Sequence, residues 1–264
     1  MPDGPVIIFD SGFGGLSVVR EIRRQMPALS LVYVADDAAF PYGGMEAEHL
    51  KAHVVTTVSR IIDRFAPSAV VIACNTASTL VLEPLRAEHD LPFVGTVPAI
   101  KPAARLTQSG LIAVLATPAT IERDYTRDLI SQFAETCHVR LVGAPLLAEM
   151  AEAHMLGGRI DRNALWDQVA PCFYELDGRR ADIIALACTH YPFLTDRMQS
   201  IAPWRVTWLD PAEAIARRLG QVTKGRDFGV RTDQPVLLTS GHSADRAAGL
   251  LFHEFGFSAT GLSC

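Results

Sequence analysis

Short apolar runs alternate with longer segments of helical periodicity along the whole chain. The apolar runs are rich in Val, Ile and Leu, a composition typical of strands that are buried on both faces of a parallel sheet. The longer segments repeat apolar positions at spacings of three and four residues, which predicts amphipathic helices between the strands. Strands that alternate with helices predict an α/β protein with parallel sheets.

The pattern also predicts where the elements lie. Strands are expected at residues 5–9, 31–35, 69–73, 111–116, 139–142, 182–187, 206–209 and 235–239. Helices are expected at residues 15–25, 47–64, 77–89, 121–133, 162–176 and 212–219.

A weak internal duplication connects the two halves of the chain. Residues 6–10 resemble residues 112–116, and residues 70–76 resemble residues 183–189 at a similar offset. Each copy of the second segment contains a cysteine, Cys74 or Cys188. We therefore expect two related α/β halves, each of which places one cysteine after the equivalent strand.

Composition and charge narrow the class of protein. The chain is 49% hydrophobic and 20% charged, which excludes a disordered protein. Its apolar runs stop after about six residues, far short of the roughly 18 that span a bilayer, and its start lacks the features of a signal peptide, so a cytoplasmic protein is expected. The net charge is −5 and no segment concentrates Lys and Arg, which argues against a nucleic-acid partner.

Small polar residues follow four of the predicted strands. In parallel α/β sheets, ligands bind at the carboxyl ends of the strands, so these segments are candidates for a functional site. The four segments are Asp10 to Gly15, Asp36 to Gly44, Cys74 to Ser78 and Cys188 to Pro192. The first resembles a dinucleotide-binding loop only in Gly12 and Gly14, since Ser17 stands where a third glycine belongs.

Two of the five cysteines stand where a thiol can carry chemistry. Cys74 and Cys188 each follow a predicted buried strand and precede polar residues, near backbone N–H groups that favour a thiolate. Such a thiol can exchange protons, although burial as a small apolar residue is the common fate of a cysteine. Cys137, Cys172 and Cys264 lack this context, so no chemical role is expected for them.

Other polar residues could assist these thiols. His190 could relay protons or hold a carboxylate, and Asp10 could polarise Cys74. Further acidic candidates are Asp36, Glu149, Glu152 and Asp210. A zinc site on the cysteines and His190 stays a minor alternative, because no close second pair of ligands is present.

Five segments together resemble the glutamate racemase family of the cofactor-independent aspartate/glutamate racemase superfamily. They are Asp10 to Val18, Pro41 to Gly43, Cys74 to Ser78, Val97 to Pro102 and Cys188 to Pro192, in order and at similar spacing over nearly the whole chain. The resemblance implies an isomerase that interconverts L- and D-glutamate for peptidoglycan and cell-wall synthesis. It implies no pyridoxal phosphate and no metal, which fits a chain with only three lysines.

The resemblance also implies roles for individual residues. Cys74 and Cys188 would transfer the protons, with Asp10, His190 and Glu152 as assisting catalytic residues. The substrate would bind to Asp10, Ser11, Tyr42, Gly43, Asn75, Thr76, Thr189 and His190. The sequence departs from the family pattern in two places. Ala187 replaces the glycine that usually precedes the second cysteine, and the segment before Glu152 differs from the apolar segment of the family. Glu149 is therefore an alternative to Glu152 as the auxiliary acid.

The family architecture implies two pseudo-symmetric parallel-sheet domains with the active site between them. The expected domains are residues 1–97 with 210–264, and residues 98–209. Glutamate is the expected partner, no membrane is expected, and a homodimer is left open. Aspartate racemase and a non-catalytic amino-acid-binding module remain alternative functions, while a thiol–disulfide oxidoreductase is disfavoured because neither thiol has a resolving cysteine nearby.

Overall fold

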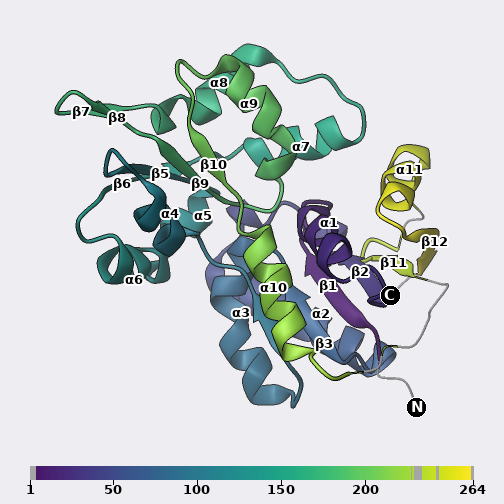
Figure 1. Cartoon of the computed structure of the whole chain (residues 1–264). Coiled ribbons are helices and arrows are strands. Elements are labelled where there is room, and N and C mark those ends of the chain that lie inside the picture. Colours follow the sequence, from purple (N-terminus) through teal and green to yellow (C-terminus); the bar gives the residue numbers. More distant parts are fainter. Residues whose placement is uncertain (1–3, 227, 229–233, 242–243, 263–264) are drawn as a thin grey trace. The chain divides into compact units, whose positions relative to one another are not determined.

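The chain folds into two compact α/β units, shown in the computed structural model in Figure 1. The first unit comprises Met1–Thr96 with Ala212–Cys264, and the second comprises Val97–Pro211. The structure describes residues 4–226, 228, 234–241 and 244–262. Each unit has its own parallel sheet, which confirms the predicted α/β class.

The first unit is built on a six-stranded sheet with the order β12-β11-β2-β1-β3-β4, and every pairing in it is parallel. Its strands are β1 (Val6–Asp10), β2 (Leu31–Ala35), β3 (Ala69–Ile72), β4 (Phe93–Gly95), β11 (Pro235–Leu238) and β12 (Ser258–Leu262). Its helices are α1 (Leu16–Gln25), α2 (Ala47–Phe65), α3 (Asn75–Glu88), α10 (Ala212–Val222) and α11 (Arg246–Glu254).

Alternate residues of these strands face two layers of helices. Ile7, Phe9, Val70 and Ile72 join a core with the apolar faces of α2 and α3. Tyr33 points to the opposite face, where its ring contacts two phenylalanines of the C-terminal segment, Phe252 and Phe257. Because both faces are covered, the strands read as continuous apolar runs.

The second unit contains a four-stranded parallel sheet with the order β10-β9-β5-β6. Its strands are β5 (Leu111–Ala116), β6 (His138–Gly143), β9 (Ile183–Ala187) and β10 (Thr207–Leu209), with a small antiparallel hairpin of β7 (Glu175–Leu176) and β8 (Arg179–Arg180). Its helices are α4 (Ile100–Leu106), α5 (Pro118–Ile121), α6 (Asp124–Phe133), α7 (Leu147–Met155), α8 (Arg162–Val169) and α9 (Thr195–Ile201).

The two sheets share one strand order. The order β2-β1-β3-β4 in the first unit matches β6-β5-β9-β10 in the second, with β1 and β5 in equivalent central places. Phe9 pairs with Ile72 at the end of β3, and Ala116 pairs with Ala187 at the end of β9. The two segments that looked duplicated in the sequence therefore occupy the same topological positions.

Two of the predicted helices are wrong in extent. The helix expected at 162–176 ends at Val169, because Pro171 cannot donate a backbone hydrogen bond, and the chain continues through a 3-10 turn, Ala170–Cys172, into β7. The helix expected at 121–133 begins only at Asp124, as α6, because Ile121 is the last residue of α5 and residues 122–123 separate the two helices. The expected elements also omit β4, β12, α4, α7, α9 and α11, among others.

No described helix combines the length and the apolar character needed to cross a membrane.

Candidate active-site residues in each unit

Asp10 is held at the carboxyl end of β1 by a tight glycine-rich turn. Its side chain is completely buried, and Oδ2 accepts a hydrogen bond from the backbone N–H of Gly12 at 3.1 Å. Tyr33 donates its hydroxyl proton to the Gly12 carbonyl at 2.8 Å. A Cβ at Gly15 would lie 2.8 Å from both the Asp10 Cβ and the Tyr33 hydroxyl oxygen, so this turn requires glycine for close packing.

Cys74 is the N-cap residue of α3, two residues after β3 ends. Its residue is only 5% exposed, and its backbone is extended, with φ −65° and ψ 121°. The helix that starts at Asn75 directs its N-terminal dipole toward this position, which favours a negative charge there. The thiol therefore stands where a thiolate is stabilised by the backbone.

Asn75 has a side-chain donor without a partner in the described part of the chain. Its Oδ1 accepts a hydrogen bond from the Thr96 hydroxyl at 3.3 Å. Its Nδ2 is buried and has no hydrogen-bond partner among the described residues. An unpaired buried donor is costly, so an amide kept in this state next to Cys74 is suited to an acceptor that arrives with a ligand.

Tyr42 belongs to a buried polar network around Asp36. Its hydroxyl donates to Asp36 Oδ2, and the same carboxylate lies 2.6 Å from His53 Nε2 and accepts a hydrogen bond from Thr239 at 2.6 Å. Burial raises the pKa of Tyr42, and the negative charges of Asp36, Cys74 and Asp10 raise it further. Tyr42 therefore stays a neutral donor close to these groups.

The other expected binding residues of this unit lie in the same segments. Ser11 follows Asp10 and is 4% exposed, and Thr76 follows Asn75 and is 3% exposed. Gly43 is in the 3-10 turn Tyr42–Gly44. The carboxyl end of the first sheet thus gathers polar residues from the loops after β1, β2 and β3.

In the second unit, Cys188 directly follows β9 and begins a chain of polar contacts. Its Sγ lies 3.7 Å from His190 Nδ1, and His190 Nε2 lies 2.9 Å from Glu152 Oε1. The Thr189 hydroxyl oxygen is 3.4 Å from His190 Nδ1. A neutral imidazole that donates from Nε2 to Glu152 presents Nδ1 as an acceptor for the thiol, whereas an imidazolium donates to both neighbours.

Glu149 and Glu152, the two candidates for the auxiliary acid, differ in burial. The side chain of Glu152 is 16% exposed and that of His190 is 2% exposed, so their contact is largely withdrawn from water. Glu149, one turn earlier on α7, is exposed. The structure places Glu152, and not Glu149, against His190.

Two further threonines, Thr117 and Thr120, lie after β5 and were not among the residues expected from the sequence. Thr117 follows β5 and caps α5 by accepting from the Thr120 backbone N–H at 3.3 Å, and the two hydroxyl oxygens lie 2.9 Å apart. Both residues are buried. Thr117 occupies the position after β5 that Ser11 occupies after β1. A polar residue before Pro118, at the end of a predicted strand, is the signal that could have identified it.

The remaining described cysteines differ from Cys74 and Cys188. Cys172 is completely buried, and burial raises the pKa of its thiol to about 12 against the opposing charge of Arg140. Cys137 is partly buried against the apolar core of the second unit. Cys264 lies outside the described residues. Within the described ranges, no group of three or more His, Cys, Asp or Glu side chains is arranged to hold a metal ion.

The comparisons with known proteins place this chain, with its two parallel-sheet units, in a class of racemases. Residues 13–219 match the model of the Asp/Glu/hydantoin racemase family, and the chain belongs to that family. It is 54% identical over 261 residues to the glutamate racemase of Mesorhizobium japonicum, covering 98% of this chain and 99% of that protein. It is also 54% identical to the glutamate racemase of Brucella anthropi, covering 96% of this chain and 92% of that protein.

A solved structure is similar over the same extent. Escherichia coli glutamate racemase, crystallised with L-glutamate and the activator UDP-MurNAc-Ala, superposes with a TM-score of 0.89 at 35% identity. The match covers 99% of this chain and 98% of that chain.

Proposed function

We propose that this protein is a glutamate racemase that interconverts L- and D-glutamate with Cys74 and Cys188 as its two proton-transfer groups. The observation that carries the proposal is the equivalent placement of the two thiols, each within two residues of the end of the strand that pairs with β1 or β5. The relatives and the solved structure named above support glutamate as the substrate.

The reaction exchanges one proton at Cα. The Cys188 thiolate removes the Cα proton of L-glutamate, and the electron pair of the broken C–H bond stays on the substrate as a carbanion. The Cys74 thiol then donates a proton to the opposite face of the planar carbanion, which gives D-glutamate and leaves Cys74 as the thiolate. The reverse reaction uses the same groups in exchanged roles, and no electron acceptor is needed. Positioned acids and bases of this kind contribute about 10²–10⁴-fold each.

Each thiol has a polar assistant in its own unit. As an imidazolium held by Glu152, His190 stabilises the charge of the Cys188 thiolate by donating from Nδ1. Asp10 is the proposed assistant for Cys74, because it is buried at the end of β1, the strand that pairs with β3.

Hydrogen-bond donors must stabilise the charge that develops on the substrate carboxylate. The unpaired Nδ2 of Asn75 is the strongest candidate, because its cost in the free protein is recovered when a carboxylate oxygen accepts from it. The other proposed contacts to substrate are made by Ser11, Tyr42, Gly43, Thr76 and Thr189. The reaction proposed here needs neither pyridoxal phosphate nor a metal, and its product would supply D-glutamate for peptidoglycan.

Substitution of each thiol tests the proposal. Cys74→Ser and Cys188→Ser should each lower racemisation of L-glutamate by at least about tenfold, because a serine hydroxyl is a much weaker acid than a thiol. The change in optical activity, followed by circular dichroism, measures the rate, with L-aspartate as the competing substrate. Cys137→Ser and Cys172→Ser are matched controls that should keep their activity. A Cys74 or Cys188 variant that retains most activity would remove that thiol from the mechanism.

Deuterium transfer tests the two-group mechanism separately. In D₂O, the first D-glutamate formed from L-glutamate should carry deuterium at Cα, because Cys74 delivers a solvent-derived deuteron. A single base that serves both faces would return the original proton. Protium retained in early D-glutamate, detected by NMR, would therefore contradict two-group transfer even if both thiols proved essential.

A further inference from the structure

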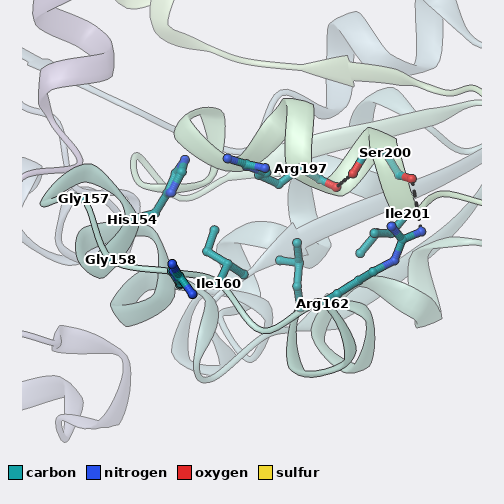
Figure 2. Close-up of a pocket in the computed structure, with 10 residues that line it drawn as sticks. His154, Gly157, Gly158, Ile160, Arg162, Arg197, Ser200 and Ile201 are labelled. Carbon is teal, nitrogen blue, oxygen red and sulfur yellow. Dashed lines mark hydrogen bonds between the residues drawn. The ribbon is translucent and has the colours of Figure 1, made fainter.

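A cavity of about 470 Å³ lies in the second unit, formed by α7, the segment 156–161, α8 and α9. Its basic lining residues are His154, Arg159, Arg162 and Arg197, and we call it the basic cavity. Figure 2 shows the His154 ring and the Arg197 guanidinium on the same side of this space. The proposed proton-transfer chemistry uses none of these four side chains.

The charge in the basic cavity is of one sign. No Asp or Glu is among its lining residues, although the whole chain has a net charge of −5. Asp161, which precedes Arg162, is instead the N-cap of α8 and accepts a hydrogen bond from the Ala164 backbone N–H at 2.8 Å. In the part of the chain that the structure describes, no ion pair joins Arg159, Arg162 or Arg197 to a carboxylate.

The three arginines are exposed, and their like charges lie around one cavity. Water screens the repulsion between these guanidinium groups without removing it, and Arg162 is the first residue of α8, where the helix dipole disfavours a cation. Hydrogen bonding does not neutralise the charge, since among the described residues Arg162 donates to the Ser200 carbonyl at 3.5 Å, and a carbonyl has no net charge. An anion bound among these groups would relieve both effects.

The backbone between α7 and α8 forms a tight turn beside the basic cavity. Gly157 has φ +87°, which L side chains rarely adopt, and a Cβ at Gly158 would lie 2.6 Å from the Ala153 carbonyl oxygen. The Gly158 backbone N–H donates to that carbonyl at 2.7 Å. This turn brings Arg159 and the start of α8 next to the end of α7, so the cluster of cations follows from the fold of the segment.

We propose that the basic cavity binds a small organic diphosphate. Guanidinium groups pair with phosphate oxygens in a bidentate manner, and several arginines from different segments match a ligand with more than one anionic group. Ile160, Leu165 and Ile201 supply an apolar wall for the organic part of the ligand. The volume lies within the range of about 300–1,000 Å³ that is common for small-molecule sites.

Calorimetric titration with inorganic pyrophosphate tests the proposal on the full chain, at constant ionic strength. The wild type should bind one pyrophosphate, more tightly than orthophosphate, and ADP should bind at the same site. The variant Arg159→Gln with Arg197→Gln should weaken pyrophosphate binding by at least about tenfold, the effect of losing a charge-assisted hydrogen bond. The matched control Arg105→Gln with Arg127→Gln removes two exposed charges of the same unit outside the cavity lining, and should bind like the wild type.

Equal affinity in the cavity variant and the control would overturn the proposal, as would the absence of binding to the wild type. Circular dichroism verifies folding, and Arg197→Gln alone replaces the double variant if the latter does not fold. Because binding is measured directly, the result is independent of whether the protein racemises glutamate.

Discussion

Replacing Glu152 by glutamine should weaken the support that α7 gives to His190. Glutamine keeps the size of the side chain and an acceptor oxygen, so His190 Nε2 can still donate a hydrogen bond. The negative charge is lost, and with it the difference between a hydrogen bond to a charged group, about 1.5–3 kcal/mol, and one to a neutral group, about 0.5–1.5 kcal/mol. The 2.9 Å contact is largely withdrawn from water, so little of this difference is screened.

A loss of about 1–1.5 kcal/mol from the transition state corresponds to about a 5- to 13-fold decrease in kcat/KM. Glu152→Ala removes the acceptor altogether and should cost more, up to about 100-fold. L- and D-glutamate have equal free energies, so kcat/KM must fall by the same factor in both directions. That equality is an internal check on the measurement.

Glu149→Gln is the matched control on the same helix. Glu149 is exposed one turn before Glu152, so its neutralisation should leave kcat/KM unchanged. Initial rates in both directions, followed by circular dichroism, decide the comparison, with thermal melting to verify folding. A large effect of Glu149→Gln with little effect of Glu152→Gln would refute the assignment of Glu152 to His190.

Two further substitutions test other parts of the structure. Gly15→Ala should lower the free energy of unfolding by about 1–3 kcal/mol, because the new Cβ would lie 2.8 Å from atoms of Asp10 and Tyr33; urea unfolding that matches the wild type would contradict this packing. Burial opposes ionisation of Asp182, but hydrogen bonds from Thr107 and two backbone N–H groups outweigh it and lower the pKa of the carboxyl. Asp182→Asn should therefore lower the free energy of unfolding by about 1 kcal/mol at pH 7, a loss that solvent screening reduces. The loss should become smaller as the pH falls below about 3.9, because the wild-type carboxyl then protonates. Urea unfolding that shows a larger loss in acid would contradict the assignment.

Local patterns in the sequence were sufficient for the class of fold and for most of the buried strands. β2 and β5 have the predicted bounds, because a run of β-branched and aliphatic residues of this length is stable only in the middle of a covered sheet. Short or edge elements such as β4 and β7 have no such signal, since pairing with a neighbouring strand, and not their own composition, makes them strands. The predicted bounds of a helix were less accurate where a proline interrupted a continuous periodic pattern, as at Pro171.

For the candidate site, too, local sequence was enough for some residues and tertiary packing was needed for others. Residue type and position after a strand were enough to select Cys74, Cys188, Asp10 and His190, because the end of a buried strand places a side chain at one edge of the sheet. The choice between Glu149 and Glu152 could not be made from sequence. Both are acidic residues of one helix, and only the packing of α7 beside the segment after β9 brings one of them to His190.

Contacts between distant segments depended on tertiary structure alone. The sequence offers Asp36 as one acid among several, whereas the fold surrounds it with Tyr42, His53 and Thr239, the last of these 203 residues away. The basic cavity likewise combines α7, the segment 156–161, α8 and α9, whose basic side chains are spread over residues 154–197 of the sequence. Sequence determined which side chains stand at the ends of strands, because that depends on local periodicity; the tertiary structure decided which charges meet, because electrostatic interactions depend on distance in space and on exclusion of water.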